Sequence, residues 1–407
     1  MTSAVSILRL AAGGDGVGKL ADGRTVFVPR TAPGDVVELA DVRTAKRFAR
    51  ARLQRVLRPA PDRVTPPCRH YTADECGGCQ LQHLAYAAQL ESRRGFAGDA
   101  LRRVGRLDVA DPPIEPAPDQ FGYRTRITLA ARRGCIGLHR YGRPTAVFDL
   151  DQCPITADSL NTLWRHLSAA RALLPPGLEQ LVLRLDLAGR RHVIARVAAT
   201  RAWTRADELA RRLVEAAAPA VLWWEPEGGV PRVVAGRPGG EPPAGVFEQV
   251  HPAMAERARA FAVDRLGRVE GLEVWDLYAG VGETTAILAR RGARVSSVEL
   301  DRRAVAYAER AGPAATRRAG AVEALAASLP GPDLVVTNPP RTGMDAGVTA
   351  LLASRRPGRI VYISCDPATL ARDVVRLGAG YRLSETRCFD FFPQTAHVET
   401  VAVLERT

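Results

Sequence analysis

Cys365 has the residue type and the surroundings needed for nucleophilic chemistry. It follows an apolar run that reads as a strand, and it precedes Asp366 and Pro367, which are favoured as the cap and the first residue of a helix. The positive end of that helix is expected to lower the pKa of the thiol and to favour the thiolate. A lone cysteine is more often a packing residue, but this position favours a nucleophile.

Glu399 is the candidate for a general base. It lies in an alternating run near the end of the chain, in which Val401 and Val403 share its parity. A carboxylate on the apolar face of a strand is either paired or a base with an altered pKa. His397 shares that parity as well.

A glycine-rich bend predicts a nucleoside site. The stretch 274–301 contains an apolar run, the bend, a helical segment and a second β run, which is the order of a βαβ unit. Gly280 and Gly282 let backbone N–H groups approach a ligand, and Glu299 can accept hydrogen bonds from ribose hydroxyls. A dinucleotide fingerprint would have a third glycine where this chain has Thr285, and no phosphate-binding loop occurs. The pattern therefore indicates S-adenosylmethionine, which has a ribose and an amino-acid tail but no phosphate.

Cysteines in the first half of the chain have the spacing of a metal site. Cys68, Cys76 and Cys79 follow the pattern C-x7-C-x2-C, and Cys153 is the candidate for a fourth thiolate. Thiolates at this spacing suit an iron–sulfur cluster or a structural zinc. The single close pair favours the cluster, although His83 could complete a Cys3His zinc site.

The charge of the chain and its first 58 residues indicate a polyanionic partner. The 407 residues have a formal net charge of +13, and 46% of them are hydrophobic. Residues 1–58 alternate apolar and polar positions around tight turns, which predicts a small β-barrel. Its last run is rich in basic residues, and Phe48 among them is available to stack on a base. The expected RNA-binding residues are Arg43, Lys46, Arg47 and Arg50.

Two further domains are expected after the barrel. Residues 59–245 mix helical and β patterns around the cysteine site, and 225–244 reads as a flexible or edge-hairpin region. From 246 to 407 a strict α/β alternation predicts a doubly wound sheet with a closing β-hairpin, the layout of class I methyltransferases. No run has the length of a membrane span and no signal peptide is evident, so we expect a cytoplasmic protein without membrane contact. No obligate protein partner is inferred.

The chain resembles the RNA (uracil-C5)-methyltransferases. The motifs that carry the resemblance are F-E-Q-V-H (Phe247 to His251), D-L-Y-A-G-V-G, N-P-P-R-T-G, Y-I-S-C-D-P-A-T-L-A-R-D (Tyr362 to Asp373) and F-D-F-F-P-Q-T-A-H-V-E (Phe389 to Glu399). The run G-D-G-x-G-K-x-x-D-G-R and the basic end of the first domain resemble the TRAM domain, an RNA-binding barrel. The whole chain is similar to the subgroup with a TRAM domain and a four-cysteine [4Fe-4S] site, which acts on 23S ribosomal RNA.

The resemblance implies a reaction with a covalent intermediate. Cys365 would add to C6 of uracil, C5 would take the methyl group of S-adenosylmethionine, and Glu399 would remove the C5 proton. The uracil would have to be single-stranded or flipped out of a duplex. The expected cofactor-binding residues are Gln249, Tyr278, Gly280, Gly282, Glu283, Glu299 and Asn338.

Two positions depart from the family pattern. Asn338 stands where the family usually has Asp in D-P-P-R, and His251 stands where F-x-Q-V-N ends in Asn. Because an amide has donors as well as an acceptor, recognition of base or cofactor can differ at Asn338. Asn-Pro-Pro also occurs in amino-methyltransferases, but those enzymes need no cysteine nucleophile.

Two other functions are compatible with the pattern. An RNA (cytosine-C5)-methyltransferase shares the attack of a thiolate on C6, but such enzymes typically have a second cysteine in a Pro-Cys motif, where this chain has Pro339 and Pro340. A non-catalytic RNA-binding factor could keep the same architecture and lose methyl transfer.

Overall fold

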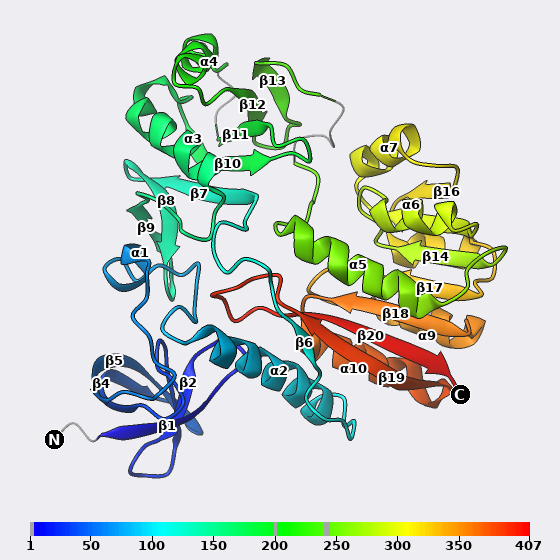
Figure 1. Cartoon of the computed structure of the whole chain (residues 1–407), viewed down its shortest axis with the longest axis horizontal. Coiled ribbons are helices and arrows are strands. Elements are labelled where there is room, and N and C mark those ends of the chain that lie inside the picture. The colour runs from blue at the N-terminus through cyan, green and yellow to red at the C-terminus, as the bar shows by residue number, and fades with distance from the viewer. Residues whose placement is uncertain (1–3, 199–201, 240–244) are drawn as a thin grey trace. The chain divides into compact units, whose positions relative to one another are not determined.

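The computed structural model describes residues 4–198, 202–239 and 245–407 (Figure 1). Its contacts divide the chain into two compact units. The first unit comprises Met1–Phe96, Asp119–Pro238 and Phe392–His397. The second unit comprises Ala97–Pro118, Gly239–Phe391 and Val398–Thr407. The division into domains at 1–58, 59–245 and 246–407 is based on composition and stays a prediction.

The first unit begins with a closed barrel, as the alternating pattern predicts. Its strands follow the order β1-β2-β3-β5-β4. They are β1 (Val5–Leu10), β2 (Gly16–Lys19), β3 (Thr25–Val28), β4 (Val36–Thr44) and β5 (Phe48–Arg58). Inward-facing aliphatic side chains such as Val26 and Val37 are fully buried in the barrel core. Gly16 is needed because a Cβ there would lie 1.9 Å from Thr31 Oγ1.

The rest of the first unit is built on a seven-stranded sheet of order β13-β12-β11-β10-β7-β8-β9. These strands are β7 (Arg126–Arg132), β8 (Cys135–Arg140), β9 (Arg143–Asp149), β10 (Leu178–Leu185), β11 (Arg191–Val197), β12 (Ala220–Pro226) and β13 (Arg232–Ala235). The helices are α1 (Arg69–Thr72), α3 (Asp158–Ala169), α4 (Ala206–Glu215) and the residues of α2 (Tyr86–Arg103) up to Phe96. The expected edge hairpin is β12–β13, whereas 240–244 lie outside the described residues.

The second unit is an α/β sheet of order β16-β15-β14-β17-β18-β20-β19-β6. Its strands are β6 (Ile114–Glu115), β14 (Glu273–Leu277), β15 (Arg294–Glu299), β16 (Thr316–Ala319), β17 (Leu334–Thr337), β18 (Arg359–Ser364), β19 (Tyr381–Phe389) and β20 (Glu399–Arg406). Its helices are α5 (Pro252–Leu266), α6 (Glu283–Arg290), α7 (Arg302–Ala311), α8 (Val322–Leu325), α9 (Ala346–Arg355) and α10 (Pro367–Leu377). Strands β14 to β18 run parallel, and β20 is antiparallel between β18 and β19. The predicted doubly wound sheet with a closing hairpin is confirmed.

The centre of this sheet is buried on both faces. All residues of β14 and β17 are buried, which is typical of parallel strands covered by helices. Trp275, Tyr362 and Leu404 from three of the strands join one core with residues of α9 and α10. Because the parallel strands are fixed in register, their carboxyl ends lie along one edge of the sheet. Within the described part of the chain, no helix is long and apolar enough to cross a membrane.

Candidate active site

The nucleophile and the base expected from the sequence lie at the same edge of the sheet. Strand β18 ends at Ser364, and β20 begins at Glu399. These strands are antiparallel, with Ser364 opposite Thr400, so the next positions in register are Cys365 and Glu399. Their electrostatic interaction is large enough to shift the pKa of the Cys365 thiol. The fold therefore brings together a thiol and a carboxyl group that are 34 residues apart in the sequence.

The local structure after Cys365 is the one that its neighbours predict. Asp366 caps α10, because its Oδ1 accepts hydrogen bonds from Ala368 N at 2.9 Å and Thr369 N at 3.1 Å. Pro367 is the first residue of the helix. Cys365 therefore stands between the end of a buried strand and the start of a capped helix.

The expected lowering of the Cys365 pKa is wrong for the protein without substrate. Burial raises the pKa of the Cys365 thiol to about 11, nearby Glu399 adds to the rise, and Arg341 opposes it. Burial also raises the pKa of Glu399, to about 8, again against the effect of Arg341. The loss of solvation and the neighbouring carboxylate outweigh the helix end. Both groups are therefore mainly protonated near neutral pH.

The raised pKa of Glu399 predicts a specific dependence of stability on pH. An unfolded glutamate titrates near 4.5, whereas the buried one titrates near 8. Its favourable contribution is complete below pH 4.5 and is lost as the pH rises through 8, because the folded state then holds an unsolvated charge. We expect the Tm of Glu399→Gln, relative to wild type, to increase between pH 5 and pH 8 and to level off above pH 8.

Thermal unfolding followed by circular dichroism measures this difference. Glu256→Gln, which removes an exposed carboxylate from α5, is the matched control and is expected to show little change with pH. A Tm difference for Glu399→Gln that stays constant from pH 5 to pH 9 would contradict the raised pKa.

Arg341, the cation that acts on both groups, lies on a loop that a buried carboxylate holds in place. Asp373 is fully buried, and its Oδ2 accepts hydrogen bonds from Met344 N at 2.8 Å and from Tyr362 Oη at 2.9 Å. Gly343 has φ +76°, and a Cβ there would lie 2.5 Å from the same oxygen. Asp373 therefore positions the loop that follows β17. Neither Arg341 nor Asp373 is among the site residues expected from the sequence, although both lie within motifs that carry the family resemblance.

The glycine-rich bend and Glu299 form the nucleoside side of the site. Glu299 Oε2 accepts a hydrogen bond from Gly280 N at 2.8 Å, and its Oε1 accepts one from Asp301 N at 2.8 Å. These bonds fix the carboxylate at the end of β15. Tyr278, Gly280 and Gly282 have φ of +62°, +56° and +81°. A left-handed tyrosine costs on the order of 1–3 kcal/mol, and such strain is concentrated at functional sites.

Thr285, which replaces the third glycine of a dinucleotide fingerprint, has its own role in the bend. Its Oγ1 donates a hydrogen bond of 2.6 Å to Asp276 Oδ2, and both residues are buried. Burial raises the pKa of the Asp276 carboxyl to about 6, partly offset by this hydrogen bond. The contact joins β14 to α6 below the bend, at the position where a dinucleotide fingerprint has a glycine for close packing of helix and strand.

The other expected cofactor residues differ in how they are held. Asn338 N donates to Leu277 O at 3.1 Å, so the ends of β17 and β14 are joined beside the bend. Gln249 is partly buried just before α5. Glu283 forms an ion pair with Arg259 of α5, so its carboxylate is already engaged within the protein. One edge of the sheet therefore carries Gly280, Glu299 and Asn338. The carboxylate of Glu283, in contrast, pairs with Arg259.

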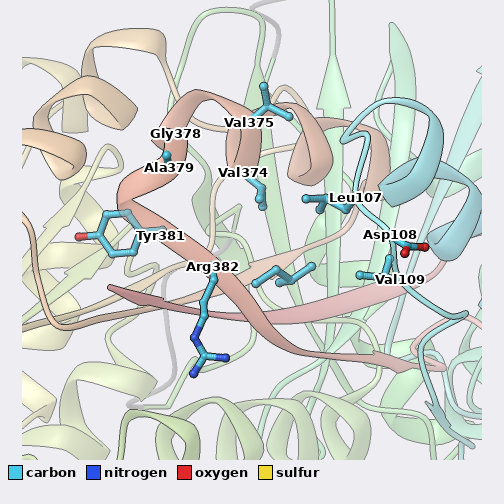
Figure 2. Close-up of a pocket in the computed structure, with 10 residues that line it drawn as sticks. Leu107, Asp108, Val109, Val374, Val375, Gly378, Ala379, Tyr381 and Arg382 are labelled. Atoms are coloured by element: carbon cyan, nitrogen blue, oxygen red, sulfur yellow. The ribbon is translucent and has the colours of Figure 1, made fainter. Parts of the chain in front are cut away.

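A pocket of the second unit lies at the opposite end of the strands and takes no part in this site. It has a volume of about 460 Å³ and is lined by residues that include Leu107, Val374 and Tyr381 (Figure 2). Tyr381 begins β19 and pairs with Arg406, whereas the other end of the same strand pairs with Glu399. The pocket is therefore about a strand length away from Cys365 and Glu399.

The four expected metal ligands gather in the first unit. Cys68 and Cys79 are buried in one cluster against which Cys153 packs, and the thiols of Cys68, Cys76 and Cys153 each influence the titration of Cys79. Gly78 N donates a hydrogen bond of 3.4 Å to Cys76 Sγ. Burial raises the pKa of Cys76 to about 11, and all four thiols are free of disulfides. The donor set fits ligation by four thiolates, in which coordination replaces the lost solvation.

The structure shows no ready site for a single metal ion in the described residues, where no three His, Cys, Asp or Glu side chains are grouped to hold one. His83, which could complete a Cys3His site, has its Nδ1 2.7 Å from Tyr71 Oη. Burial lowers the pKa of His83 to about 4, so the ring is neutral.

The basic residues of the barrel lie on an exposed end of β4 and β5. Arg43 pairs in register with Arg50, and the turn between these strands contains Lys46 and Arg47. All four side chains are exposed. Arg50 also lies over the ring of Phe27, 5.6 Å from its centroid, and Phe27 contacts Phe48 edge to face at 6.0 Å. Phe27 is not among the residues expected from the sequence, and it adds a second aromatic ring to this basic face.

Comparison with known families finds one matching family profile at each end of the chain. The profile of the family described as tRNA (Uracil-5-)-methyltransferase matches residues 332–407, which contain Cys365 and Glu399. The profile of the TRAM domain matches residues 2–53, which form most of the barrel.

Proteins that are similar over almost the whole chain give the same result. The chain is 34% identical to the 23S rRNA (uracil(1939)-C(5))-methyltransferase of Halomonas elongata, over 97% of this chain and 88% of that protein. It is 33% identical to the protein of the same description from Pseudomonas putida, over 98% of this chain and 93% of the relative. The crystal structure of Pyrococcus abyssi tRNA (uracil-54, C5)-methyltransferase with S-adenosyl-L-homocysteine has a TM-score of 0.75 and 26% identity, and the match covers 98% of this chain and 99% of that one. The fold, the motifs and the relatives agree, and the chain belongs to the RNA (uracil-C5)-methyltransferase family.

Proposed function

We propose that the protein transfers a methyl group from S-adenosylmethionine to C5 of a uridine in 23S ribosomal RNA, through a covalent adduct with Cys365. The observation that supports this most directly is that Cys365 and Glu399 lie opposite each other at one edge of the sheet. The same edge carries the glycine-rich bend at Gly280, where Glu299 is held. Uracil C5 is a poor nucleophile, and a thiol that can add to C6 removes this obstacle. As an enzyme of ribosomal RNA, the protein would act in the cytoplasm.

The proposed reaction has four steps. The Cys365 thiol releases its proton as Sγ bonds to C6, and the electrons of the C5–C6 double bond move to O4. C5 then takes the methyl group, and S-adenosylhomocysteine leaves with the electrons of the broken S–CH3 bond. The Glu399 carboxylate removes the C5 proton, the C5–C6 double bond forms again, and the C6–S bond breaks. The leaving thiolate recovers a proton, so the balance is one methyl group transferred and one proton released.

The electrostatics of the free site are consistent with these roles. A buried carboxyl whose pKa is raised to about 8 becomes a stronger base than an exposed one once it is ionised. Arg341 opposes the rise of both pKa values, so it favours the ionised forms that the reaction needs. A neutral thiol is also less readily oxidised than a thiolate, which protects Cys365 between turnovers.

The substrate is tested by supplying labelled S-adenosylmethionine with unmodified 23S ribosomal RNA and, separately, with unmodified tRNA. We expect 5-methyluridine in the ribosomal RNA and little or none in the tRNA. Methylation of tRNA alone would indicate a tRNA substrate, as in the description of the Pyrococcus abyssi protein. Formation of 5-methylcytidine would favour the cytosine-C5 alternative. Binding of RNA without methylation of either base would favour the non-catalytic factor.

We propose that Cys68, Cys76, Cys79 and Cys153 hold a [4Fe-4S] cluster. Four clustered thiols, three of them buried, supply the donor set that such a cluster requires. In a four-iron cluster each thiolate binds a different iron, so the sulfurs stand farther apart than around one zinc ion. The cluster would supply cross-links among these segments of the chain, and no step of the methyl transfer depends on its redox chemistry.

Elemental analysis tests the cluster directly. Protein purified without oxygen is expected to contain four iron and four sulfide per chain, and Cys79→Ser is expected to lose most of both. Cys135→Ser is the matched control, because Cys135 is a partly exposed cysteine of β8 outside the group. One zinc per chain without sulfide would contradict the cluster and favour the zinc alternative.

We propose that the exposed end of β4 and β5 binds the RNA backbone. Each phosphate contact on a single strand contributes about 0.7 to the slope of log K against log salt concentration, so replacing Arg43, Lys46, Arg47 and Arg50 by alanine is expected to flatten the slope by roughly 3. Titration of a fluorescent RNA fragment at several salt concentrations measures this slope. The matched control replaces Arg211, Arg212, Arg232 and Arg237, which are also exposed in the first unit. An equal decrease of the slope in both variants would mean that RNA binding depends on the net charge of the protein and not on this face.

A further inference from the structure

The loop of Arg341 follows β17 at the edge of the sheet where the reacting groups lie. Strand β17 pairs with β18, which ends directly before Cys365, and β18 pairs with β20, which begins at Glu399. Arg341 is exposed, and in the part of the chain that the structure describes no hydrogen bond or ion pair holds its side chain. Its charge acts on both Cys365 and Glu399. A cation without a partner among these residues therefore lies beside the nucleophile and the base.

The backbone of Arg341 is restricted on both sides. Pro339 and Pro340 precede it, and each proline ring fixes its own φ. Gly343 N donates a hydrogen bond to Pro340 O at 2.8 Å, which closes a turn around Arg341 and Thr342. The position of the Arg341 backbone therefore depends on where this turn is held.

The turn is held by the side chain of Asp373, in the second half of α10. Asp373 is fully buried, and its Oδ2 accepts hydrogen bonds from Met344 N at 2.8 Å and from Tyr362 Oη at 2.9 Å. Its Oδ1 accepts bonds from Arg372 Nε at 2.9 Å and Arg372 Nη2 at 2.8 Å. The same Nη2 donates to Thr342 O at 2.8 Å. One buried carboxylate therefore organises the donors that hold the turn against the helix.

Gly343 shows how closely the turn lies against α10. A Cβ at this position would lie 2.4 Å from Arg372 Nη2 and 2.5 Å from Asp373 Oδ2. Its φ of +76° is also in the left-handed region that favours glycine. Because Asp373 Oδ2 is fixed by its two other hydrogen bonds, an added methyl group would displace the turn from the helix. Such a substitution moves the turn without changing any charge.

The same helix holds the nucleophile at its other end. Asp366 caps the first turn of α10 and directly follows Cys365. Asp373 lies further along this helix and holds the turn that contains Arg341. One element therefore fixes the thiol and, through the turn, the cation that acts on it.

We infer that Asp373 is a positioning residue that holds Arg341 beside Cys365, so that the cation stabilises the thiolate that attacks the base. This inference rests on the proposed function, because it takes Cys365 as the nucleophile that must lose its proton. Asp373 touches neither the base nor the cofactor in this scheme. It acts through the turn, and without its charge Arg372 loses the partner that directs it toward Thr342.

Charges from three elements act on the Cys365 thiol. After burial, which is the largest cause, Glu399 at the start of β20 and Asp366 at the start of α10 raise its pKa, and Arg341 lowers it. If Arg341 moves away, the thiol remains beside two carboxylates. Its pKa then rises further, and less thiolate forms at any given pH.

The direct effect of the Asp373 charge has the opposite sign. Asp373→Asn removes an anion and releases Arg372 and Arg376, which pair with Asp373 at 2.8 and 3.3 Å. Each of these changes by itself favours a thiolate. A loosened structure would also expose the thiol and speed its reaction with a small reagent. A slower reaction of Cys365 in this variant would therefore indicate a displaced Arg341.

The rate of alkylation of Cys365 by iodoacetamide reports the thiolate in the free protein. We would follow the peptide that contains Cys365 by mass spectrometry at pH 8 and low salt, because salt screens the charge of an exposed arginine. The single variants are Asp373→Asn, Gly343→Ala and Arg341→Gln. Gly343→Ala tests the same contact if Asp373→Asn does not fold. The double variant of Asp373→Asn and Arg341→Gln tests whether the two residues act through one another.

Two variants of the second unit are matched controls. Asp333→Asn removes a carboxylate that accepts a hydrogen bond from Glu273 N at 2.8 Å, before the start of β17. Gly271→Ala places a methyl group at another left-handed glycine, with φ +73°, where nothing lies within 4 Å. Both repeat the chemical change away from the turn, so alkylation should keep the rate of the wild type.

We expect alkylation of Cys365 to slow by about threefold in Asp373→Asn, Gly343→Ala and Arg341→Gln. Loss of a nearby cation raises the pKa of an acid by about one unit, which leaves about tenfold less thiolate. The more basic thiolate is a better nucleophile by about threefold, which offsets part of this loss. The double variant should be no slower than Arg341→Gln alone.

An unchanged or faster reaction in Asp373→Asn and Gly343→Ala, or additive slowing in the double variant, would overturn the inference. An unchanged rate in Arg341→Gln would also overturn it, because the cation would then not act on the thiol. The measurement needs neither RNA nor S-adenosylmethionine, so its result is independent of the proposed function. Slower alkylation with normal methyl transfer in the same variants would leave the role of Asp373 in place and contradict the nucleophilic step proposed for Cys365.

Discussion

Replacing Cys365 by alanine is expected to abolish methyl transfer, with a loss on the order of 10⁴-fold or more, because no other group in the scheme can saturate C6 of the base. The most direct measurement uses RNA that contains 5-fluorouridine. Fluorine at C5 cannot be removed as a proton, so the wild-type protein should stop as a covalent adduct after the methyl group has been transferred. Cys365→Ala should give no adduct, and the wild type should need S-adenosylmethionine to form the stable one.

The control for this variant is Cys135→Ala, which removes another partly exposed thiol and is expected to keep the adduct and the turnover of the wild type. Binding of the RNA should be unchanged in both variants, since a thiol contributes little to the contact with a polyanion. An adduct that persists in Cys365→Ala would mean that a different residue attacks the base. Methyl transfer at the normal rate without any adduct would favour a mechanism with no covalent step.

Glu399→Gln is expected to lower turnover by about 10² to 10⁴-fold, the usual contribution of a general base. The amide keeps the size of the side chain and cannot take the C5 proton, so the methylated adduct should accumulate with unmodified uridine RNA. The loss should appear in kcat, and KM should fall with it, because the slow step follows an adduct that accumulates after both substrates have bound. Quench-flow separation of adduct formation from adduct release measures the two steps independently.

Two outcomes would contradict this role of Glu399. A variant that turns over normally would show that solvent or another group removes the proton. A variant that forms no adduct would place Glu399 before the methyl transfer, for example in the ionisation of Cys365, whose pKa its charge affects. Glu256→Gln is the matched control and should behave as the wild type, because this exposed glutamate of α5 is not among the residues of the site.

Features that depend on neighbours along the chain could be predicted before the structure was known. Alternation around tight turns predicted the barrel, and the α/β periodicity predicted the doubly wound sheet. Asp366 and Pro367 predicted the start of α10, because capping depends on three or four consecutive residues. The same locality explains why Cys365, Gly280 and Glu299 could be chosen as site residues, since each stands at the end of a strand that can be recognised from its own apolar run.

Properties that arise between distant segments appear only in the folded chain. The pKa of Cys365 is raised because burial and Glu399 act on it together, and neither the burial nor the neighbour can be seen in the helix start that predicted the opposite shift. The role of Asp373 in holding the loop that contains Arg341 can be recognised only in the folded chain, where α10 lies beside that loop. The loop 392–397 reads as an ordinary hairpin connection, and its attachment to Gln80 spans more than 300 residues of sequence. Solvation and long-range hydrogen bonds depend on packing, and packing is a property of the folded chain as a whole.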